Sequence, residues 1–279
     1  LRMMRHEMNQ RQHDRLRRVT SRQNALLKAI RQAFTQAEAT EEGLVAIEGV
    51  KTIDEAIRSG LRVHAVLFSD AGAARAEHLL PQVPKQAEAI VVADEIFKSV
   101  VETKSPQGVA ALVEFKTHAL ESILSSVDPL LVIAHGLQDP GNLGTITRTA
   151  EAFGAAGLVL CEGTVSRYNA KAIRASAGSS FRLPTVTAKF EDVARQMREH
   201  GIRLIGTSSH EGSALPETDL RGSVAIVIGN EGAGLPKPIV AKLDALLTIP
   251  HASQVESLNA AMAASLILYE ASRQRRTYL

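Results

Sequence analysis

The 279-residue sequence has one cysteine, Cys161, no tryptophan and few aromatic residues. A single cysteine excludes an internal disulfide framework and fits a reducing compartment. No apolar run approaches the roughly 20 residues that cross a bilayer, and the start of the chain lacks the apolar segment of a signal peptide. The nine histidines show no metal-ligand spacing. We therefore expect a cytoplasmic protein without a metal site.

Positive charge is concentrated at the N-terminal end. Residues 1–31 hold nine Lys or Arg and two acidic residues, whereas the whole chain has a net charge of only +2. A basic N-terminal arm, residues 1–19, suits phosphate binding, and the candidate contacts are Arg11, Arg15, Arg17 and Arg18. The alternative is a solvated leader. The arm has no aromatic side chains to stack on bases, which argues against sequence-specific recognition by it.

Two blocks of alternating strand and helix patterns divide the rest of the chain. Residues 20–116 contain four short β runs and helices between them, without a His–carboxylate cluster or a Gly-rich phosphate loop. A boundary is expected at Asp128-Pro129. Beyond it, in residues 128–279, six stronger β runs alternate with helices, which predicts a parallel sheet covered on both faces. Ligands of such sheets bind at the carboxyl ends of the strands, so the loops that follow strands are the candidate sites.

The first of these loops is HGLQDPGNLGTITRTAEAFGA, residues 135–155. Asp139-Pro140-Gly141 predicts a tight turn, and a helix is expected over 145–153. The start of this helix would offer free N–H groups to an anion. Arg148 would lie one turn into the helix, where a cation opposes the helix dipole. This position favours a functional Arg148 over an ordinary surface arginine.

The second loop is VIGNEGAGLP, residues 227–236, with glycines at 229, 232 and 234. Three glycines in six residues indicate a close backbone approach or positive φ angles. The spacing G-x-x-G-x-G differs from the dinucleotide pattern G-x-G-x-x-G, and no acidic ribose partner follows about 20 positions on. A nucleotide-dependent metabolic enzyme is therefore disfavoured. Glu231 is either an acceptor that closes the loop or a ligand contact.

The third loop begins the segment IPHASQVESLNAAMAASLILYE, residues 249–270. Four apolar residues recur there at helical spacing: Leu258, Met262, Leu266 and Tyr269. Alanines fill the other faces, which predicts a helix buried all round. Ser257 is either an ordinary helix N-cap or a ligand contact. Asn259 is expected inside the first turn, where no cap is needed, so a ligand-facing role is favoured.

The three segments together resemble a known set of motifs. D-P-G-N-L-G-T-x-x-R-T-A (139–150), I-G-N-E-G-x-G-L (228–235) and I-P…V-E-S-L-N-A (249–260) are similar to the motifs of SpoU-type RNA 2′-O-ribose methyltransferases of the SPOUT superfamily. Residues 20–115 are similar to the ribosomal-protein-like RNA-binding domain that often precedes them. The sequence departs from the family at His251, where Met is usual, and at Ala260-Ala261, where Val-Ser is usual.

The resemblance implies an α/β protein with a knotted parallel-sheet SPOUT domain, S-adenosyl-L-methionine as cofactor, and a homodimer packed through the knotted region. It assigns cofactor binding to Thr207, Ile228, Gly229, Asn230, Ile249, Ser257 and Leu258. It assigns catalysis to Arg148, together with Asn142, Glu231, Ser257 and Asn259. Arg148 would activate the hydroxyl or anchor the target phosphate, and a bare arginine is a poor base because its pKa exceeds about 12.

The expected function is therefore methylation of a ribose 2′-hydroxyl in RNA. Ribosomal RNA is favoured as substrate because a separate RNA-binding domain precedes the catalytic one. Two alternatives stay open at this point. One is a tRNA 2′-O-methyltransferase, and the other is a non-catalytic RNA-binding protein that keeps the fold.

Overall fold

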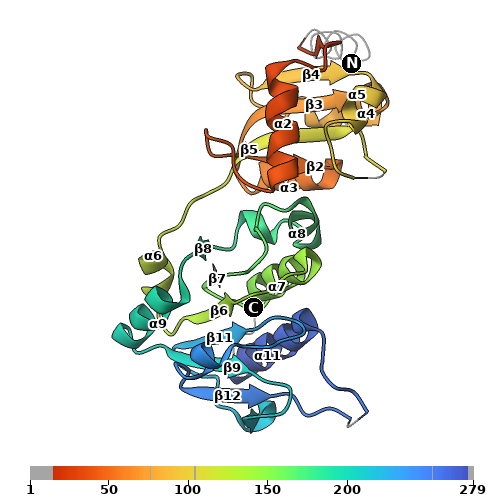
Figure 1. The fold of residues 1–279 in the computed structure, drawn as a ribbon. Coiled ribbons are helices and arrows are strands. Elements are labelled where there is room, and N and C mark those ends of the chain that lie inside the picture. The colour runs from red at the N-terminus through yellow and green to blue at the C-terminus, as the bar shows by residue number, and fades with distance from the viewer. Residues whose placement is uncertain (1–14, 76, 104, 253, 276–279) are drawn as a thin grey trace. The chain divides into compact units, whose positions relative to one another are not determined.

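A computed structural model of the chain describes residues 15–75, 77–103, 105–252 and 254–275. The chain forms two compact units: Leu1–Lys116 with Tyr168–Arg174, and Thr117–Arg167 with Ala175–Leu279. Figure 1 shows the elements of both units. Within the described ranges, every helix is too short or too polar to cross a membrane.

The first unit contains a five-stranded mixed sheet with the strand order β1-β4-β3-β5-β2. Its strands are β1 (Arg17–Arg18), β2 (Leu44–Glu48), β3 (Arg62–Ser69), β4 (Glu88–Val92) and β5 (Val109–Glu114). Strand β5 runs antiparallel to β2 and β3, whereas β4 pairs in parallel with β1 and β3. The helices are α2 (Ala25–Gln36), α3 (Val50–Arg58), α4 (Asp70–Arg75), the 3-10 turn η1 (Glu77–Leu79) and α5 (Asp94–Lys98).

Helix α2 supplies much of the core of this unit. Leu27, Ile30 and Phe34 are buried and join one hydrophobic cluster with residues of the strands. The spacing of these residues places them on one face of the helix. Asn24 caps the helix, because its side chain accepts hydrogen bonds from the N–H groups of its first turn.

The basic residues that precede α2 are bound to the first unit. Arg17 forms an ion pair with Glu88, and Arg18 forms one with Asp70 at 2.6 Å. Arg15 donates hydrogen bonds to three backbone carbonyls of residues 80–84. Residues 1–14, and Arg11 with them, lie outside the described residues. Three of the four proposed phosphate contacts thus have partners within the chain.

The second unit is built on a seven-stranded sheet with the order β10-β12-β9-β11-β6-β7-β8. Its strands are β6 (Leu130–Ala134), β7 (Gly157–Leu160), β8 (Thr185–Thr187), β9 (Arg203–Thr207), β10 (Ser213–Ala214), β11 (Val224–Ile228) and β12 (Ala245–Thr248). All pairings between these strands are parallel, which confirms the predicted sheet type. The two-residue edge strand β10 was not predicted.

Helices lie on both faces of this sheet (Figure 1). The helices and 3-10 turns of this unit are α6 (Leu120–Leu124), α7 (Pro140–Ala152), η2 (Ser179–Phe181), α9 (Phe190–Glu199), η3 (Leu215–Glu217), α10 (Lys237–Val240) and α11 (Ala260–Gln274). Helix α8 (Ala170–Ala175) falls almost entirely in the segment Tyr168–Arg174, which belongs to the first unit. On one face, Ile123 of α6 and Phe190 and Met197 of α9 share a cluster with Leu131 and Val227. Helices α7 and α11 pack against each other. Because the strands are parallel, the loops after β6, β9, β11 and β12 share one edge.

Helix α7 begins earlier than the sequence predicts. It starts at Pro140 instead of Thr145, because the Asp139 side chain caps it by accepting the N–H of Asn142 at 2.9 Å. Proline suits the first helical position, where its missing N–H costs no hydrogen bond. Arg148 consequently lies far beyond the first turn, so the argument that it opposes the helix dipole was wrong.

Helix α11 also differs from the prediction. It starts at Ala260, and Asn259 is its N-cap, with Oδ1 accepting the N–H groups of Ala261 and Met262 at 2.9 and 3.2 Å. The expectation that Asn259 lies inside the first turn was therefore wrong, and so was the reading of Ser257 as the cap.

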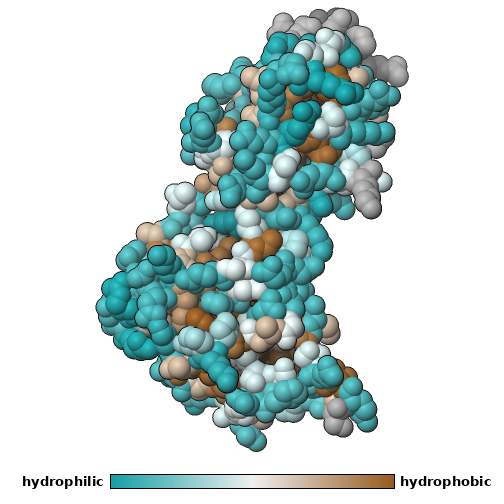
Figure 2. All heavy atoms as spheres, in the orientation of Figure 1, coloured by the Kyte–Doolittle hydropathy of each residue, from teal (hydrophilic) through white to brown (hydrophobic). Residues whose placement is uncertain are grey.

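The prediction that α11 is buried all round was wrong as well. The exposed fractions are 60% for Met262, 45% for Leu266 and 55% for Tyr269, whereas Ala264 and Ile267 on the other face are buried. Apolar residues appear at the surface over α7 and α11 (Figure 2). Three apolar residues at helical spacing form an exposed stripe on α11, and such a surface usually marks an interaction site.

Candidate cofactor pocket and active site

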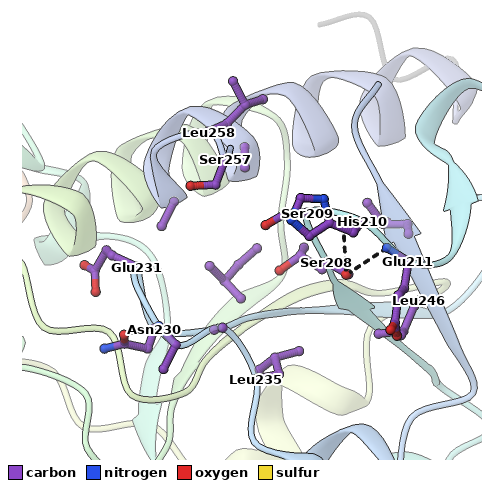
Figure 3. Close-up of a pocket in the computed structure, with 18 of the residues that line it drawn as sticks. Ser208, Ser209, His210, Glu211, Asn230, Glu231, Leu235, Leu246, Ser257 and Leu258 are labelled. Carbon is purple, nitrogen blue, oxygen red and sulfur yellow. Dashed lines mark hydrogen bonds between the residues drawn. The ribbon is translucent and has the colours of Figure 1, made fainter. Parts of the chain in front are cut away.

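A cavity of about 660 Å³ lies at the carboxyl edge of the sheet of the second unit (Figure 3). The loop of residues 207–211 follows β9, and the loop of residues 228–235 follows β11. Residues 249, 251, 257 and 258 follow β12, and residues of β12, α10 and α11 supply the remaining wall. The volume is in the range of pockets for cofactors and other small molecules.

All seven residues that the sequence assigns to cofactor binding line this cavity: Thr207, Ile228, Gly229, Asn230, Ile249, Ser257 and Leu258. They come from three loops that are distant in the sequence. The parallel arrangement of β9, β11 and β12 brings the loops to one place.

The loop after β11 is folded tightly around Gly229. A Cβ atom at Gly229 would lie 2.6 Å from the carbonyl carbon of Gly234, so only glycine fits. Asn230 and Gly234 exchange backbone hydrogen bonds at 3.1 and 3.0 Å. The side chain of Asn230 donates to the carbonyl of Gly136 at 2.9 Å, which ties this loop to the one after β6.

Glu231 closes the cavity edge by accepting hydrogen bonds from the first loop. Its carboxylate accepts the N–H groups of Gln138 and Asp139 at 3.1 and 3.0 Å, and Nδ2 of Asn142 at 3.0 Å. Partial burial by itself would raise the pKa of Glu231, but these hydrogen bonds outweigh it and hold the pKa below 4.5. Glu231 is thus the loop-closing acceptor, and it also lines the cavity.

Asn142 connects Glu231 to Asn259. Nδ2 of Asn259 donates to Oδ1 of Asn142 at 3.0 Å, while Oδ1 of Asn259 caps α11. The direction of every bond is fixed, because a carboxylate only accepts and a backbone N–H only donates. The network Glu231–Asn142–Asn259 therefore links all three loops with defined side-chain orientations.

Ser257 is exposed and lines the cavity. Figure 3 shows it near the end of the cavity that holds Asn230 and Glu231, whereas Glu211 and Leu246 lie at the other end. Its hydroxyl makes no hydrogen bond to another described residue. It is thus free to bind a ligand.

Arg148 stands apart from the other proposed catalytic residues. Its side chain is exposed on α7, it does not line the cavity, and it makes no hydrogen bond or ion pair with the described residues. A hydrogen bond of 3.1 Å between the hydroxyls of Thr149 and Ser265 joins its helix to α11. The structure does not bring Arg148 into contact with Asn142, Glu231 or Ser257 of the same chain.

Sequence reasoning missed the loop of residues 208–211, which lines one end of the cavity. The hydroxyl of Ser208 accepts the N–H groups of His210 and Glu211 at 3.3 and 3.0 Å and so shapes this turn (Figure 3). The signal was available, because a polar loop directly follows the end of a parallel strand. His251 was noted only as a departure from the family, yet it also lines the cavity.

Comparison with known protein families decides the class. The model of the SpoU rRNA Methylase family matches residues 129–269, and the model of the MRM3-like substrate binding domain matches residues 24–111. The chain belongs to the SpoU rRNA methylase family. The fold class and the enzyme class predicted from the sequence are thereby confirmed. The chain is an RNA 2′-O-ribose methyltransferase that uses S-adenosyl-L-methionine.

Individual rRNA methyltransferases resemble the chain over nearly its full length. It is 32% identical over 255 residues to the 23S rRNA (guanosine(2553)-2′-O)-methyltransferase RlmP of Bacillus subtilis, covering 91% of this chain and 98% of that protein. It is 33% identical over 268 residues to the 23S rRNA (uridine(2479)-2′-O)-methyltransferase of Streptomyces viridochromogenes, covering 93% of each. The AdoMet-bound rRNA methyltransferase from Sinorhizobium meliloti superimposes with a TM-score of 0.81 at 29% identity, covering 93% of this chain and 98% of that chain.

The cavity fits the cofactor of the SpoU family. Four apolar side chains, Ile228, Leu246, Leu247 and Ile267, offer a surface for an adenine ring. Gly229 also lines the cavity, and polar groups of Asn230, Glu231 and Ser257 lie at one end. A few polar groups in a mostly apolar pocket are what a nucleoside-containing ligand requires.

Proposed function

We propose that the protein methylates a ribose 2′-hydroxyl of ribosomal RNA. The observation that carries this proposal is the cavity whose edge is held by the Glu231–Asn142–Asn259 network. The choice of ribosomal RNA is supported by two relatives whose names specify 23S rRNA and by a substrate-binding domain at residues 24–111. Ribosomal RNA as substrate, together with the single cysteine, supports a cytoplasmic location.

In this proposal, residues 20–116 bind the RNA substrate and residues 128–279 carry the reaction. Thr207, Ile228, Gly229, Asn230, Ile249, Ser257 and Leu258 hold S-adenosyl-L-methionine. When bound, the cofactor supplies an electrophilic methyl group on a sulfonium sulfur. The protein then has to place the ribose hydroxyl in line and help to remove its proton.

The polar network supports the positioning part of this task. Asn142 is held from two sides, by Glu231 and by Asn259, so its helix and the cofactor loops keep a fixed relation. Preorganisation of this kind lowers a barrier because little reordering is needed during reaction. Glu231 is ionised at neutral pH, and its carboxylate already accepts three hydrogen bonds, which favours a positioning role over a role as general base.

The side chain of Arg148 is available to contact the RNA substrate. Its guanidinium is exposed and has no partner among the described residues. A fork of N–H donors with a permanent charge suits a phosphate next to the target ribose. Activation of the hydroxyl by Arg148 remains the second possibility within this proposal.

Three arginines of the basic N-terminal arm, Arg15, Arg17 and Arg18, already have partners within the first unit. A phosphate would have to compete with these contacts, so the phosphate-binding role of residues 1–19 stays a prediction.

The exposed stripe on α11 supports a homodimer. Met262, Leu266 and Tyr269 are apolar residues with large exposed fractions on a helix that packs only one face against its own chain. A second copy of the chain would bury this stripe. Arg148 lies on α7, which packs against α11, so the same interface would bring it near a partner.

A transfer assay with separated RNA classes tests the proposed function. RNA from a strain that lacks the enzyme is incubated with the purified protein and S-adenosylmethionine carrying a radioactive methyl group. We expect label in ribosomal RNA at one 2′-O-methylated nucleotide. Label in tRNA alone would favour the tRNA alternative. Cofactor and RNA binding without transfer would favour a non-catalytic RNA-binding protein.

A further inference from the structure

One imidazole at the cavity wall uses only one of its two ring nitrogens. His251 is partly buried, lines the cavity, and has Nδ1 2.7 Å from the backbone carbonyl of Ile249. A carbonyl can only accept a hydrogen bond, so Nδ1 carries the proton. In the neutral ring the lone pair is therefore on Nε2. Among the described residues, no donor binds this nitrogen.

We propose that Nε2 of His251 accepts a hydrogen bond from S-adenosylmethionine, and that only the neutral ring permits tight binding. This inference depends on the proposed assignment of the cavity to the cofactor. The cofactor offers several donors: the amino group of adenine, the ribose hydroxyls and the α-ammonium group. When the cofactor fills the pocket, Nε2 of His251 loses its hydrogen bond to water. Without a donor from the cofactor, this lost bond would not be replaced, which would weaken binding.

Protonation of His251 would oppose binding in two ways. Nε2 would become a donor and lose its ability to accept. The ring would also add a positive charge beside a ligand whose sulfonium and ammonium groups already make it cationic. Histidine is the side chain that ordinarily changes charge between about pH 5 and 8, so pH is the variable that tests the proposal.

Four other ionisable side chains line the same cavity: His210, Glu211, Glu231 and Lys237. Glu231 is engaged by three hydrogen bonds from the first loop. Glu211 and His210 are exposed on the loop after β9, and Lys237 is exposed on α10. His210 is the only other imidazole among the described lining residues, so it supplies the matched control.

The test measures the dissociation constant of S-adenosylmethionine by calorimetry between pH 5.5 and 8.5 at constant ionic strength. The whole protein is used as wild type, His251→Met, His251→Gln and His210→Ala. For the wild type, we expect affinity to fall with acidification toward about tenfold per pH unit, because only the neutral fraction binds. His210 also lines the cavity, so His210→Ala controls for the pH dependence and not for the absolute affinity: its affinity should fall with acidification as steeply as that of the wild type.

The His251 variants should lose the pH dependence. His251→Met removes both the acceptor and the titration, so its binding should be roughly three- to tenfold weaker at pH 8 and almost flat with pH. His251→Gln retains an acceptor without titrating, so it should bind close to the wild type at pH 8 and remain tight at pH 5.5. Thermal unfolding without ligand establishes that each variant is folded.

S-adenosylhomocysteine separates the two effects of protonation. It lacks the sulfonium charge, so its affinity should fall less on acidification than that of S-adenosylmethionine, because only the lost acceptor acts. Superimposed pH curves for wild type and folded His251→Gln would overturn the proposal, and so would a pH dependence that disappears only in His210→Ala. A wrong assignment of the cavity to the cofactor would give a different result. In that case, Gly229→Ala would still bind S-adenosylmethionine with the wild-type affinity.

Discussion

Asn259 donates a hydrogen bond from Nδ2 to Oδ1 of Asn142 at 3.0 Å, and its own Oδ1 caps helix α11. One short side chain thus holds the start of α11 and orients a residue of the first loop. Asn142 in turn donates a hydrogen bond to the carboxylate of Glu231 in the second loop, so the three side chains are oriented together. The cavity wall and the proposed catalytic edge are therefore built from the same contacts.

The two functions of Asn259 can be separated by substitution. Asn259→Asp keeps a good capping oxygen but removes the donor to Asn142, whereas Asn259→Ala removes both. We expect Asn259→Ala to lower the free energy of unfolding by about 0.5–2 kcal/mol and Asn259→Asp to lower it less. Both should reduce single-turnover methylation by orders of magnitude if Asn142 positions the reaction. Thermal unfolding and single-turnover assays check this, and a fully active Asn259→Asp would limit Asn259 to capping.

The lowered pKa of Glu231 predicts that the free energy of unfolding depends on pH. Its folded-state pKa lies below the ordinary value of 4.5, so the ionised carboxylate stabilises the folded protein above about pH 4.5. This contribution is lost as the pH falls through the folded-state pKa. Glu231→Gln should cost on the order of 1 kcal/mol at pH 7, because the group is partly exposed, and the difference from wild type should shrink toward pH 3.

Denaturant unfolding at several pH values measures this difference. Glu211→Gln is the control, since Glu211 lies at the other end of the cavity and its carboxylate makes no hydrogen bond with the described residues. A difference between wild type and Glu231→Gln that stays constant from pH 7 to pH 3 would contradict the linkage.

The parts of the site that the sequence predicts are those that depend on strand order. Gly229, Ile249 and Thr207 follow β runs that are strongly apolar, and a parallel sheet brings the ends of such strands to one edge. Their positions at the cavity therefore follow from the alternation of strands and helices, together with the family motifs. The trefoil knot that the resemblance implies stays a prediction.

The parts that could not be predicted depend on contacts between distant residues. Ser257 and Asn259 are both good capping residues, so the sequence does not show which of them caps α11. It also does not show that Asn259 forms a hydrogen bond with Asn142, which is distant in the sequence. Periodicity identifies Met262, Leu266 and Tyr269 as one apolar stripe, but it cannot reveal whether the same chain covers the stripe. Strand β1 consists of two arginines, and only its pairing with β4 makes it a strand.

The tight turn at Gly229 gives a test of the pocket with an internal control. In Gly229→Ala the new Cβ would lie 2.6 Å from backbone atoms of Gly234, so the loop must shift. At Gly232 in the same loop, the nearest atom to a new Cβ is 3.7 Å away. We expect Gly229→Ala to weaken S-adenosylmethionine binding by at least tenfold and Gly232→Ala to leave it within about twofold. Equal affinities in calorimetry would place the cofactor elsewhere.

The proposed homodimer is tested by placing a charge on the exposed stripe. Leu266→Lys should dissociate the dimer at micromolar concentration, because burial of an unpaired charge at an apolar interface is costly. Its folded protomer should persist, since Leu266 is 45% exposed. Glu199→Lys on the exposed side of α9 is the control for surface charge. Sedimentation analysis measures the masses, and a wild-type monomer, or an unchanged dimer in Leu266→Lys, would exclude this interface.

Arg148 gives the prediction that bears most directly on the reaction. Arg148→Ala should abolish methyl transfer while cofactor affinity and thermal stability stay nearly unchanged, because the side chain is exposed, does not line the cavity and has no partner among the described residues. If Arg148 anchors a phosphate, RNA binding should also weaken, with a salt slope reduced by about 0.9 for the lost contact. Arg148→Lys should then recover part of the RNA affinity, since lysine retains the charge without the fork. If Arg148 activates the hydroxyl instead, the salt slope should stay unchanged while the single-turnover rate falls. Loss of cofactor binding in folded Arg148→Ala, or transfer at the wild-type rate, would contradict both roles.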